Sequence, residues 1–417
     1  MKHQKMMTWV SISGTALAIF LVMVFFMVDK LPTTEGYPET NRSRMLYGGG
    51  LDLHYAKGSR SGAMSFKMAD RMYGNLDGIE KVAHSSSWGE SYNVGAPGKM
   101  AYPLSATHTD ADFWNMYDFH FISGNPYDSA SVTAGEKIAV ITRSVARKLF
   151  NKDDVTGEEI RVNTVPFIVS GVVEDINPVM KATFANIYLP FSIEEQSNTE
   201  DFGSVKVHLL MKPGVKQEEI KRQVQSRYDR LNQEFAKDST EAIYHDAPHD
   251  VEYLSKGGIF GNYTPDLSSQ HRQTYITYII LLLLPAINLS SMMRGRLRHR
   301  VSEIGVRRAF GAKRVSIIVQ LLGENFIITL IGGLIGCVLS YVFIYFAADY
   351  FFNITHLDAT GLMFATSSPS ISMLFTWSNF FIALAVCFVL NLISAFVPAW
   401  KASRVAPAEA IAKSINN

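Results

Sequence analysis

The stretch RLRHRVSEIGVRRAFGAKR, residues 296–314, interrupts the most apolar part of the chain. Seven of its nineteen residues are Lys or Arg, and Glu303 is its one acidic residue. It lies between two runs that are long enough to cross a bilayer. A run of charged residues is usually just a solvated surface. The stretch therefore indicates a function only if the order of its residues predicts a defined local structure.

The composition divides the chain into a membrane part and a soluble part. The 417 residues carry a net charge of +1, with 47% hydrophobic and 18% charged residues. Apolar residues are concentrated at the N-terminus and after Gln273, whereas residues 29–272 have the mixture of a soluble domain. The near-neutral charge argues against nucleic acid as a partner. Cys337 and Cys387 both lie in apolar runs, so we expect no disulfide framework.

Four largely uncharged runs predict four transmembrane helices. They cover residues 6–28, 273–293, 325–348 and 375–397. A cleaved signal peptide is the alternative for the first run, but its A-x-A pattern at residues 16–18 lies mid-run and is followed by IFLVMVFFMV. Before the third span, residues 315–323 are expected to form an amphipathic lead-in at the inner interface. Glu324 is then expected at headgroup depth rather than as a proton relay.

The basic residues orient these four spans. Lys2 and Lys5 precede the first span, eight Lys or Arg lie in residues 294–314, and Lys401, Arg404 and Lys413 follow the fourth span. With four spans, all three basic segments fall on the cytoplasmic side. Both termini are then cytoplasmic and residues 29–272 lie outside. The predicted fold class is therefore a membrane protein with four transmembrane α-helices and an α+β extracytoplasmic domain inserted between spans 1 and 2. The predicted domains are 1–28, 29–272 and 273–417.

The outer domain alternates between strand-like and helix-like patterns. KIAVIT (137–142), EIRV (159–162), FIVSGVVEDI (167–176) and VKVHLLMK (205–212) are typical of strands. SVARKLF (144–150) predicts a helix, and a second helix after Pro213-Gly214 has apolar residues spaced by three or four. We expect two subdomains, the inserted one near residues 115–200.

Catalytic motifs are scarce in this sequence. HDAPHD (245–250) resembles a metal-ligand cluster, but Pro248 disrupts the helix that would align His245 with His249, so a solvated loop is preferred to a metal site. No G-x-x-x-x-G-K-[ST] occurs, and Gly98-Lys99 lacks the upstream glycine. We therefore expect no enzyme, no metal and no cofactor in this chain.

The order of residues 302–312 predicts a short helix that faces the cytoplasm. Ser302 is a candidate N-cap, Glu303 suits the first turn, and Glu303 and Arg307 are four apart. Gly311 can supply the left-handed residue that ends the helix. Apolar side chains, those of Ile304, Val306 and Phe310, lie among the charges. From these residues alone, docking to another protein, binding to lipid headgroups and a purely topogenic role all stay open.

The motif around this helix resembles the FtsX/MacB-type permeases of ABC transporters, whose core is Glu-Ile-Gly-x-Arg-Arg-Ala-x-Gly-Ala. The matching core residues are Glu303, Ile304, Gly305, Arg307, Arg308, Ala309, Gly311 and Ala312; Phe310 stands where Leu is usual. Further matches are Glu324, Gly332, Gly333 and Gly336, and near the end Pro398, Ala399, Ala402, Pro407, Glu409 and Ala410. Residues 110–126 and 139–176 resemble the MacB-like extracytoplasmic domain.

This resemblance implies that residues 302–312 are a coupling helix that contacts a separate cytoplasmic ABC ATPase. ATP and Mg would then be bound by that partner, and this chain would be a non-catalytic permease of the bacterial inner membrane. It also implies a homodimer, or a heterodimer with a related permease, and mechanotransmission to the outer domain. A periplasmic adaptor is a further possible partner. Gly332-x-x-x-Gly336 would allow close approach of helices, either between subunits or within one.

Two readings of the activity remain open from the sequence. One is ATP-driven export of antibiotic, peptide or lipid-linked cargo. The other is a signalling permease that regulates an extracytoplasmic partner, such as a cell-wall hydrolase, without moving a substrate. One fold serves both, so the fold alone does not choose between them.

Overall fold

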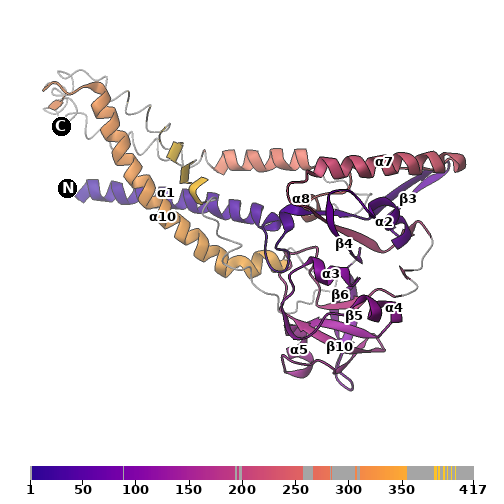
Figure 1. Ribbon diagram of the computed structural model, residues 1–417. Helices are drawn as coiled ribbons and strands as arrows, with labels where there is room; N and C mark the ends of the chain where they lie inside the picture. The colour runs from indigo at the N-terminus through magenta and orange to yellow at the C-terminus, as the bar shows by residue number, and fades with distance from the viewer. Residues whose placement is uncertain are drawn as a thin grey trace. The chain divides into compact units, whose positions relative to one another are not determined.

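The structure is a computed structural model in which the described residues are 2–87, 89–192, 195–196, 200–256, 266–281, 283, 306–307, 310–354, 380–382, 384–385, 388–389, 392, 396 and 400. The chain divides into two compact units (Figure 1). One comprises Met1–Lys30, Leu267–Ala347 and Ser370–Asn417, and the other comprises Leu31–Asp266 and Ala348–Pro369. We call them the membrane unit and the outer unit.

The membrane unit is built from long apolar helices. α1 covers Lys2–Lys30, a further helix covers residues 267–281, and α10 covers Arg314–Ile354. Among the described residues, two segments are long and apolar enough to cross a membrane, Thr8–Thr33 and Val315–Ala347. The predicted spans 273–293 and 375–397 lie in large part outside the described residues.

The third predicted span lies within a longer helix. Residues 315–323, the predicted lead-in, and residues 325–348 belong to one continuous helix, α10. Residues 315–347 contain no proline, and other helices of the chain pack against three of the four glycines in this stretch, Gly332, Gly333 and Gly336. Glu324 therefore lies within a helix rather than at the start of one.

The outer unit contains one mixed sheet with two lobes. Lobe 1 holds β1 (Met45–Gly48), β2 (Gly50–Tyr55), β3 (Gly58–Met64), β4 (Ile79–Ser86), β12 (Phe202–Gly203), β13 (Val205–Met211) and β14 (Glu241–Ala242). Lobe 2 holds β5 (Glu90–Gly95), β6 (Tyr102–Thr109), β7 (Phe121–Gly124), β8 (Ile138–Thr142), β9 (Glu159–Val162), β10 (Val165–Val173) and β11 (Ile187–Pro190). The main strand order is β11-β8-β10-β9-β5-β6-β4-β13-β3-β2-β14.

Helices pack on both lobes (Figure 1). They are α2 (Phe66–Tyr73), α3 (Asp112–Met116), α4 (Ser129–Ala134), α5 (Arg143–Phe150), α7 (Gln217–Phe235) and α8 (Val251–Ser255), with 3-10 turns η1 (Leu31–Thr33), η2 (Arg42–Arg44) and η3 (Ala236–Asp238). α2 and α7 pack on the core of lobe 1, and α5 packs on the core of lobe 2. The apolar spacing in α7 explains its position, because Ile220, Val224, Tyr228 and Leu231 form its buried face.

Several predicted elements are confirmed. β8, α5, β9, β13 and α7 occur where the residue patterns placed them. β10 ends at Val173 instead of continuing to Ile176, and the Glu174 N–H donates to the His120 carbonyl at 3.1 Å. The core of lobe 2 draws on residues from Val94 to Leu189. The boundaries of the inserted subdomain near 115–200 stay a prediction.

Candidate functional site

The end of the predicted coupling helix is visible in residues 306–307 and 310–314. Val306 and Arg307 are helical, and Gly311 follows with a φ of 91°. The Phe310 N–H donates to the Val306 carbonyl at 3.1 Å, and the Ala312 N–H donates to the Arg307 carbonyl at 3.0 Å. A bond that spans five residues across a left-handed glycine is the Schellman helix ending. Gly311 thus has the backbone conformation expected of the residue that ends this helix.

The capped end presents an aromatic side chain and is tied to α10. Phe310 is 89% exposed. The Arg307 Nη1 donates to Gln320 Oε1 at 2.8 Å, and Gln320 Nε2 lies 3.4 Å from Glu324 Oε1. Arg307 therefore orients the end of the segment against the first turns of α10. The other predicted contact residues, Glu303, Ile304, Gly305 and Arg308, lie outside the described residues, as does the predicted Glu303–Arg307 ion pair.

Three of the four glycines of α10, Gly332, Gly333 and Gly336, face other helices of the same chain. A Cβ on Gly336 would lie 2.4 Å from the Ala16 carbonyl oxygen, and one on Gly332 would lie 2.9 Å from Thr15 Cβ. A Cβ on Gly333 would meet Leu384 Cδ1 at 2.7 Å. Gly332 and Gly336 thus let α10 approach the backbone of α1.

This approach takes place within one subunit, which was one of the two alternatives for Gly332-x-x-x-Gly336. Next to it, the rings of Phe20 and Phe343 pack edge to face with centroids 5.4 Å apart. α1 also contacts the helix of residues 267–281, where Tyr278 packs edge to face on Phe25 at 4.9 Å. α1 is therefore held by two other helices of the membrane unit.

The HDAPHD loop does not gather its acidic and histidine side chains. His245 Nε2 lies 3.0 Å from Asp52 Oδ2, Asp246 pairs with Lys221, and Asp250 caps α8. His249 stacks on Tyr253 with ring centroids 3.5 Å apart, and burial, then the charge of Lys221, lowers the pKa of His249 to about 4. Among the residues that the structure describes, no group of three or more His, Cys, Asp or Glu is arranged to hold a metal. The prediction of a solvated loop is wrong in one respect, because Ala247 and Pro248 are buried.

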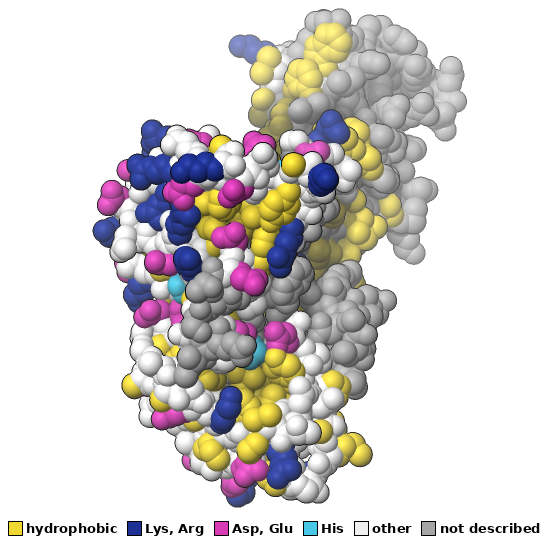
Figure 2. All heavy atoms as spheres, turned by 90° about the vertical axis from the view of Figure 1, so that its right-hand side faces the viewer, with side chains coloured by type: hydrophobic (Ala, Val, Ile, Leu, Met, Phe, Trp, Pro, Cys, Tyr) yellow, Lys and Arg dark blue, Asp and Glu magenta, His cyan; other side chains and the backbone are white. Residues whose placement is uncertain are grey.

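A groove of about 540 Å³ lies along α7 in lobe 1. It is lined by Asp77, Glu219, Arg222, Gln223, Ser226, Arg227 and Arg230. Charged side chains of both signs are also interspersed on the face of the molecule shown in Figure 2. The mixed charges of the groove favour no one class of ligand.

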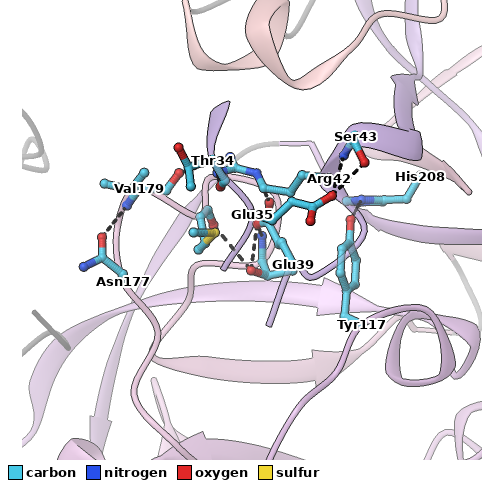
Figure 3. A network of polar contacts seen from close by, with 11 residues as sticks. Thr34, Glu35, Glu39, Arg42, Ser43, Tyr117, Asn177, Val179 and His208 are labelled. Atoms are coloured by element: carbon cyan, nitrogen blue, oxygen red, sulfur yellow. Dashed lines mark hydrogen bonds and ion pairs between the residues drawn. The ribbon is translucent and has the colours of Figure 1, made fainter. Parts of the chain in front are cut away.

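A buried ion pair lies near the start of the outer unit (Figure 3). Glu39 and Arg42 are each 1% exposed, and Arg42 Nε lies 2.8 Å from Glu39 Oε2. Glu39 Oε1 accepts hydrogen bonds from the Thr183 N–H at 3.1 Å and the Thr183 hydroxyl at 2.8 Å. Arg42 donates to the carbonyls of Thr34 and Val179 at 3.0 and 3.3 Å. Sequence analysis missed this pair, because two charges three residues apart in a loop look like ordinary surface residues.

The same interior holds His208 and Lys206 on β13. His208 Nδ1 lies 2.7 Å from the Tyr117 hydroxyl (Figure 3). Its Nε2 lies 2.8 Å from Ser85 Oγ, so both ring nitrogens are engaged. Burial, and then the charge of Lys206, lowers the pKa of His208 well below its usual range. Burial lowers the pKa of Lys206 to about 8, although Glu39 acts in the opposite direction. These groups form a polar interior rather than a reactive site.

Two family models match the chain. The MacB-like periplasmic core domain matches residues 8–227, and the FtsX-like permease C-terminal domain matches residues 275–407. The chain belongs to the MacB/FtsX family of ABC transporter permeases. The family is membrane-embedded, carries an extracellular domain, is generally non-catalytic and normally works with a cytoplasmic ATPase.

Curated relatives agree with this membership. The chain is 23% identical over 344 residues to the uncharacterized ABC transporter permease YknZ of Bacillus subtilis, covering 81% of this chain and 76% of YknZ. It is 23% identical over 376 residues to the macrolide export ATP-binding/permease protein MacB of Salmonella paratyphi A, covering 87% of this chain and 52% of MacB. The chain thus spans about half the length of that MacB, and the two matched regions are both permease regions.

Solved structures of similar outer domains include the extracellular domain of YknZ from Gram-positive bacteria and the periplasmic region of MacB from Actinobacillus actinomycetemcomitans. The YknZ domain gives a TM-score of 0.34 at 15% identity, covering 47% of this MacB/FtsX permease and all of that chain (100%). The MacB region gives a TM-score of 0.37 at 13% identity, covering 52% of this chain and 92% of that structure.

Proposed function

We propose that this MacB/FtsX permease couples ATP binding and hydrolysis in a separate cytoplasmic ABC ATPase to movement of its outer unit. ATP and Mg bind to the partner, and this chain contributes no catalytic residue. The proposal is supported by the family membership and by the absence of a G-x-x-x-x-G-K-[ST] motif from the sequence. Export of antibiotic, peptide or lipid-linked cargo is the activity we propose for the assembly.

The proposed topology has four spans in the bacterial inner membrane. Both termini and the coupling segment 302–312 face the cytoplasm, and residues 29–272 lie outside. The proposal rests on the distribution of Lys and Arg along the sequence, and α1 and α10 supply two of the helices. We further propose assembly as a homodimer, or as a heterodimer with a related permease, with a periplasmic adaptor outside.

One observation supports the ATPase contact most directly. The segment ends in a glycine cap, and its Phe310 side chain is 89% exposed. Arg307, three residues earlier, donates a hydrogen bond to Gln320. Phenylalanine and arginine are both enriched at protein–protein interfaces. A purely topogenic basic cluster needs neither the cap nor the ring.

Replacing Phe310 by aspartate is expected to reduce co-purification with the ATPase about tenfold or more, because a hot-spot residue contributes at least 2 kcal/mol. The measurement is affinity purification of the permease from native membranes, with the bound ABC ATPase quantified and ATP turnover assayed in the same sample.

Met100→Asp is the matched control, since Met100 is 73% exposed on the outer unit and we expect no change there. Equal ATPase recovery with Phe310→Asp and native protein would remove the coupling assignment. Cargo accumulation in inside-out vesicles then separates export from the signalling alternative, which predicts no accumulation.

A further inference from the structure

The two lobes of the outer unit are joined by a narrow part of the sheet. Within lobe 1, β4 pairs with β13 over seven residue pairs, Val205↔Ser86 to Met211↔Ile79. Within lobe 2, β5 pairs with β6 over five residue pairs. Between the lobes, β4 pairs with β6 only at Ser85↔Thr109 in the described residues. A junction of one ladder pair resists rotation less than a full ladder, so the position of lobe 2 depends on further contacts. Some lie beside the junction, where Asp110 pairs with His84, Tyr117 bonds His208 and α3 packs on β4. Others lie at the chain entry.

The Glu39–Arg42 pair makes such contacts. Thr183 and Val179 lie in the loop between β10 and β11 of lobe 2, whereas Glu39 and Arg42 precede β1 of lobe 1. Glu39 accepts both hydrogen bonds of Thr183, and Arg42 reaches the Val179 carbonyl. Side chains on one segment of chain therefore hold the loop of the other lobe.

The same segment is continuous with the membrane helix and is fastened to the chain exit. Leu31, the first residue of η1, directly follows Lys30 at the end of α1. Arg42 also bonds the Thr34 carbonyl, next to η1. At the exit, Tyr47 and His249 exchange two backbone hydrogen bonds at 2.7 and 2.8 Å, and η1 packs against α8.

The exit is tied to lobe 2 as well. Lys181 Nζ donates to the Ser255 carbonyl of α8 at 2.7 Å, and Lys181 belongs to the loop that Glu39 and Arg42 hold. Chain entry, chain exit and the lobe 2 loop therefore meet at one place. A pull on either connecting segment acts first on these contacts.

We propose that Glu39, Arg42 and Thr183 are positioning residues that form a buried latch, which holds lobe 2 against the chain entry. With the latch closed, lobe 2 follows the connecting segments. With the latch open, lobe 2 is held only from the β4 side, by the contacts of β6, Asp110, Tyr117 and α3, and its distance from lobe 1 varies more widely. This proposal goes beyond the coupling function, because it concerns the outer unit alone and needs no ATPase.

The chemistry of the pair favours a latch with two discrete states. A buried carboxylate and guanidinium are stable only when their hydrogen-bonding groups are satisfied, and separating them leaves uncompensated buried charge. An intermediate state, in which Thr183 or Val179 has moved away but water has not entered, leaves a buried charge unsatisfied. Its free energy is therefore higher than that of the closed state, and higher than that of an open state in which water reaches both charges.

The test measures the distance between the lobes in the full chain. Spin labels are attached at Gln225→Cys on α7 and Lys152→Cys after α5, which are both exposed, with Cys337 and Cys387 replaced by alanine. Pulsed electron spin resonance on detergent-solubilised protein gives the distribution of distances. Without the latch substitutions we expect one narrow distribution.

The latch is opened by the combination Arg42→Lys and Thr183→Val, which preserves an ion pair with Glu39. Lysine cannot reproduce the two carbonyl contacts of Arg42, and valine removes the Thr183 hydroxyl at nearly constant shape. We expect the distribution to broaden and its centre to shift. Restoring Arg42 while keeping Thr183→Val should narrow it again.

The control is Val145→Ala, which removes buried volume from the core of lobe 2 without touching the latch. We expect it to lower the unfolding temperature and to leave the distance distribution narrow. An unchanged distribution in the latch variant would overturn the proposal. Equal broadening in the Val145→Ala control would also overturn it, since the effect would then be general loosening.

Discussion

Replacing Gly336 by alanine is expected to lower the free energy of unfolding of the membrane unit by about 3 kcal/mol, the upper part of the usual range for overpacking. The added Cβ would lie 2.4 Å from the Ala16 carbonyl oxygen and 3.1 Å from Ile19 Cβ. The first of these atoms belongs to the backbone of α1, so no side-chain rotation relieves the clash. α1 and α10 must move apart, and the contacts along their interface weaken together.

The other glycines of α10 provide a graded series for this experiment. Gly332→Ala should lower the free energy of unfolding by less, since the atom nearest to its added Cβ is Thr15 Cβ at 2.9 Å. Gly333→Ala should have a smaller effect still, since its added Cβ meets the end of the flexible Leu384 side chain. Gly323→Ala is the matched control, because nothing lies within 4 Å of its Cβ. Thermal unfolding of detergent-purified protein, followed by size-exclusion chromatography, gives the ranking. Equal unfolding temperatures for Gly336→Ala and Gly323→Ala would show that α1 does not pack there.

Regular patterns were predictable from the sequence. The spacing of Ile220, Val224, Tyr228 and Leu231 predicts α7 because a helix has one buried face, and the same residues form that face. Gly311 was identified as the end of a helix because few other residues adopt a positive φ without cost, and its φ is 91°. Both features depend on residues that are close together in the chain, so the sequence alone was sufficient to predict them.

Features that depend on distant contacts were not predictable in this way. Glu39 and Thr183 are far apart in sequence, and nothing in either segment indicates that one binds the other. The choice between packing within or between subunits at Gly332 and Gly336 needed the position of α1. The HDAPHD loop was expected to be solvated because it is polar, but its partners Asp52, Lys221 and Tyr253 lie in other segments or in the following helix.

Replacing Lys206 by methionine is expected to stabilise the outer unit by up to about 3 kcal/mol at pH 7. Lys206 is 7% exposed, lies on β13, and has a pKa lowered from the usual 10.5 to about 8, mainly by burial. Among the described residues, Glu39 is the charge that favours the ammonium form of Lys206, and Glu39 is already paired with Arg42. Methionine fills a similar volume without a charge. The unfolding temperature of the full chain should therefore rise.

The pH dependence gives a second, independent measurement on Lys206. Because its pKa is lower in the folded chain than in the unfolded chain, the unfolded chain binds more protons between about pH 8 and pH 10.5. The burial cost of the ammonium is thus fully present below pH 8, and stability gained from Lys206 deprotonation appears as the pH rises through this window. Lys206→Met should lack that rise, whereas Lys212→Met, at an exposed position just after β13, should retain it. A fall in unfolding temperature for Lys206→Met at pH 7 would mean instead that the ammonium is well compensated by Glu39, and that it belongs to the buried charge network as a stabilising member.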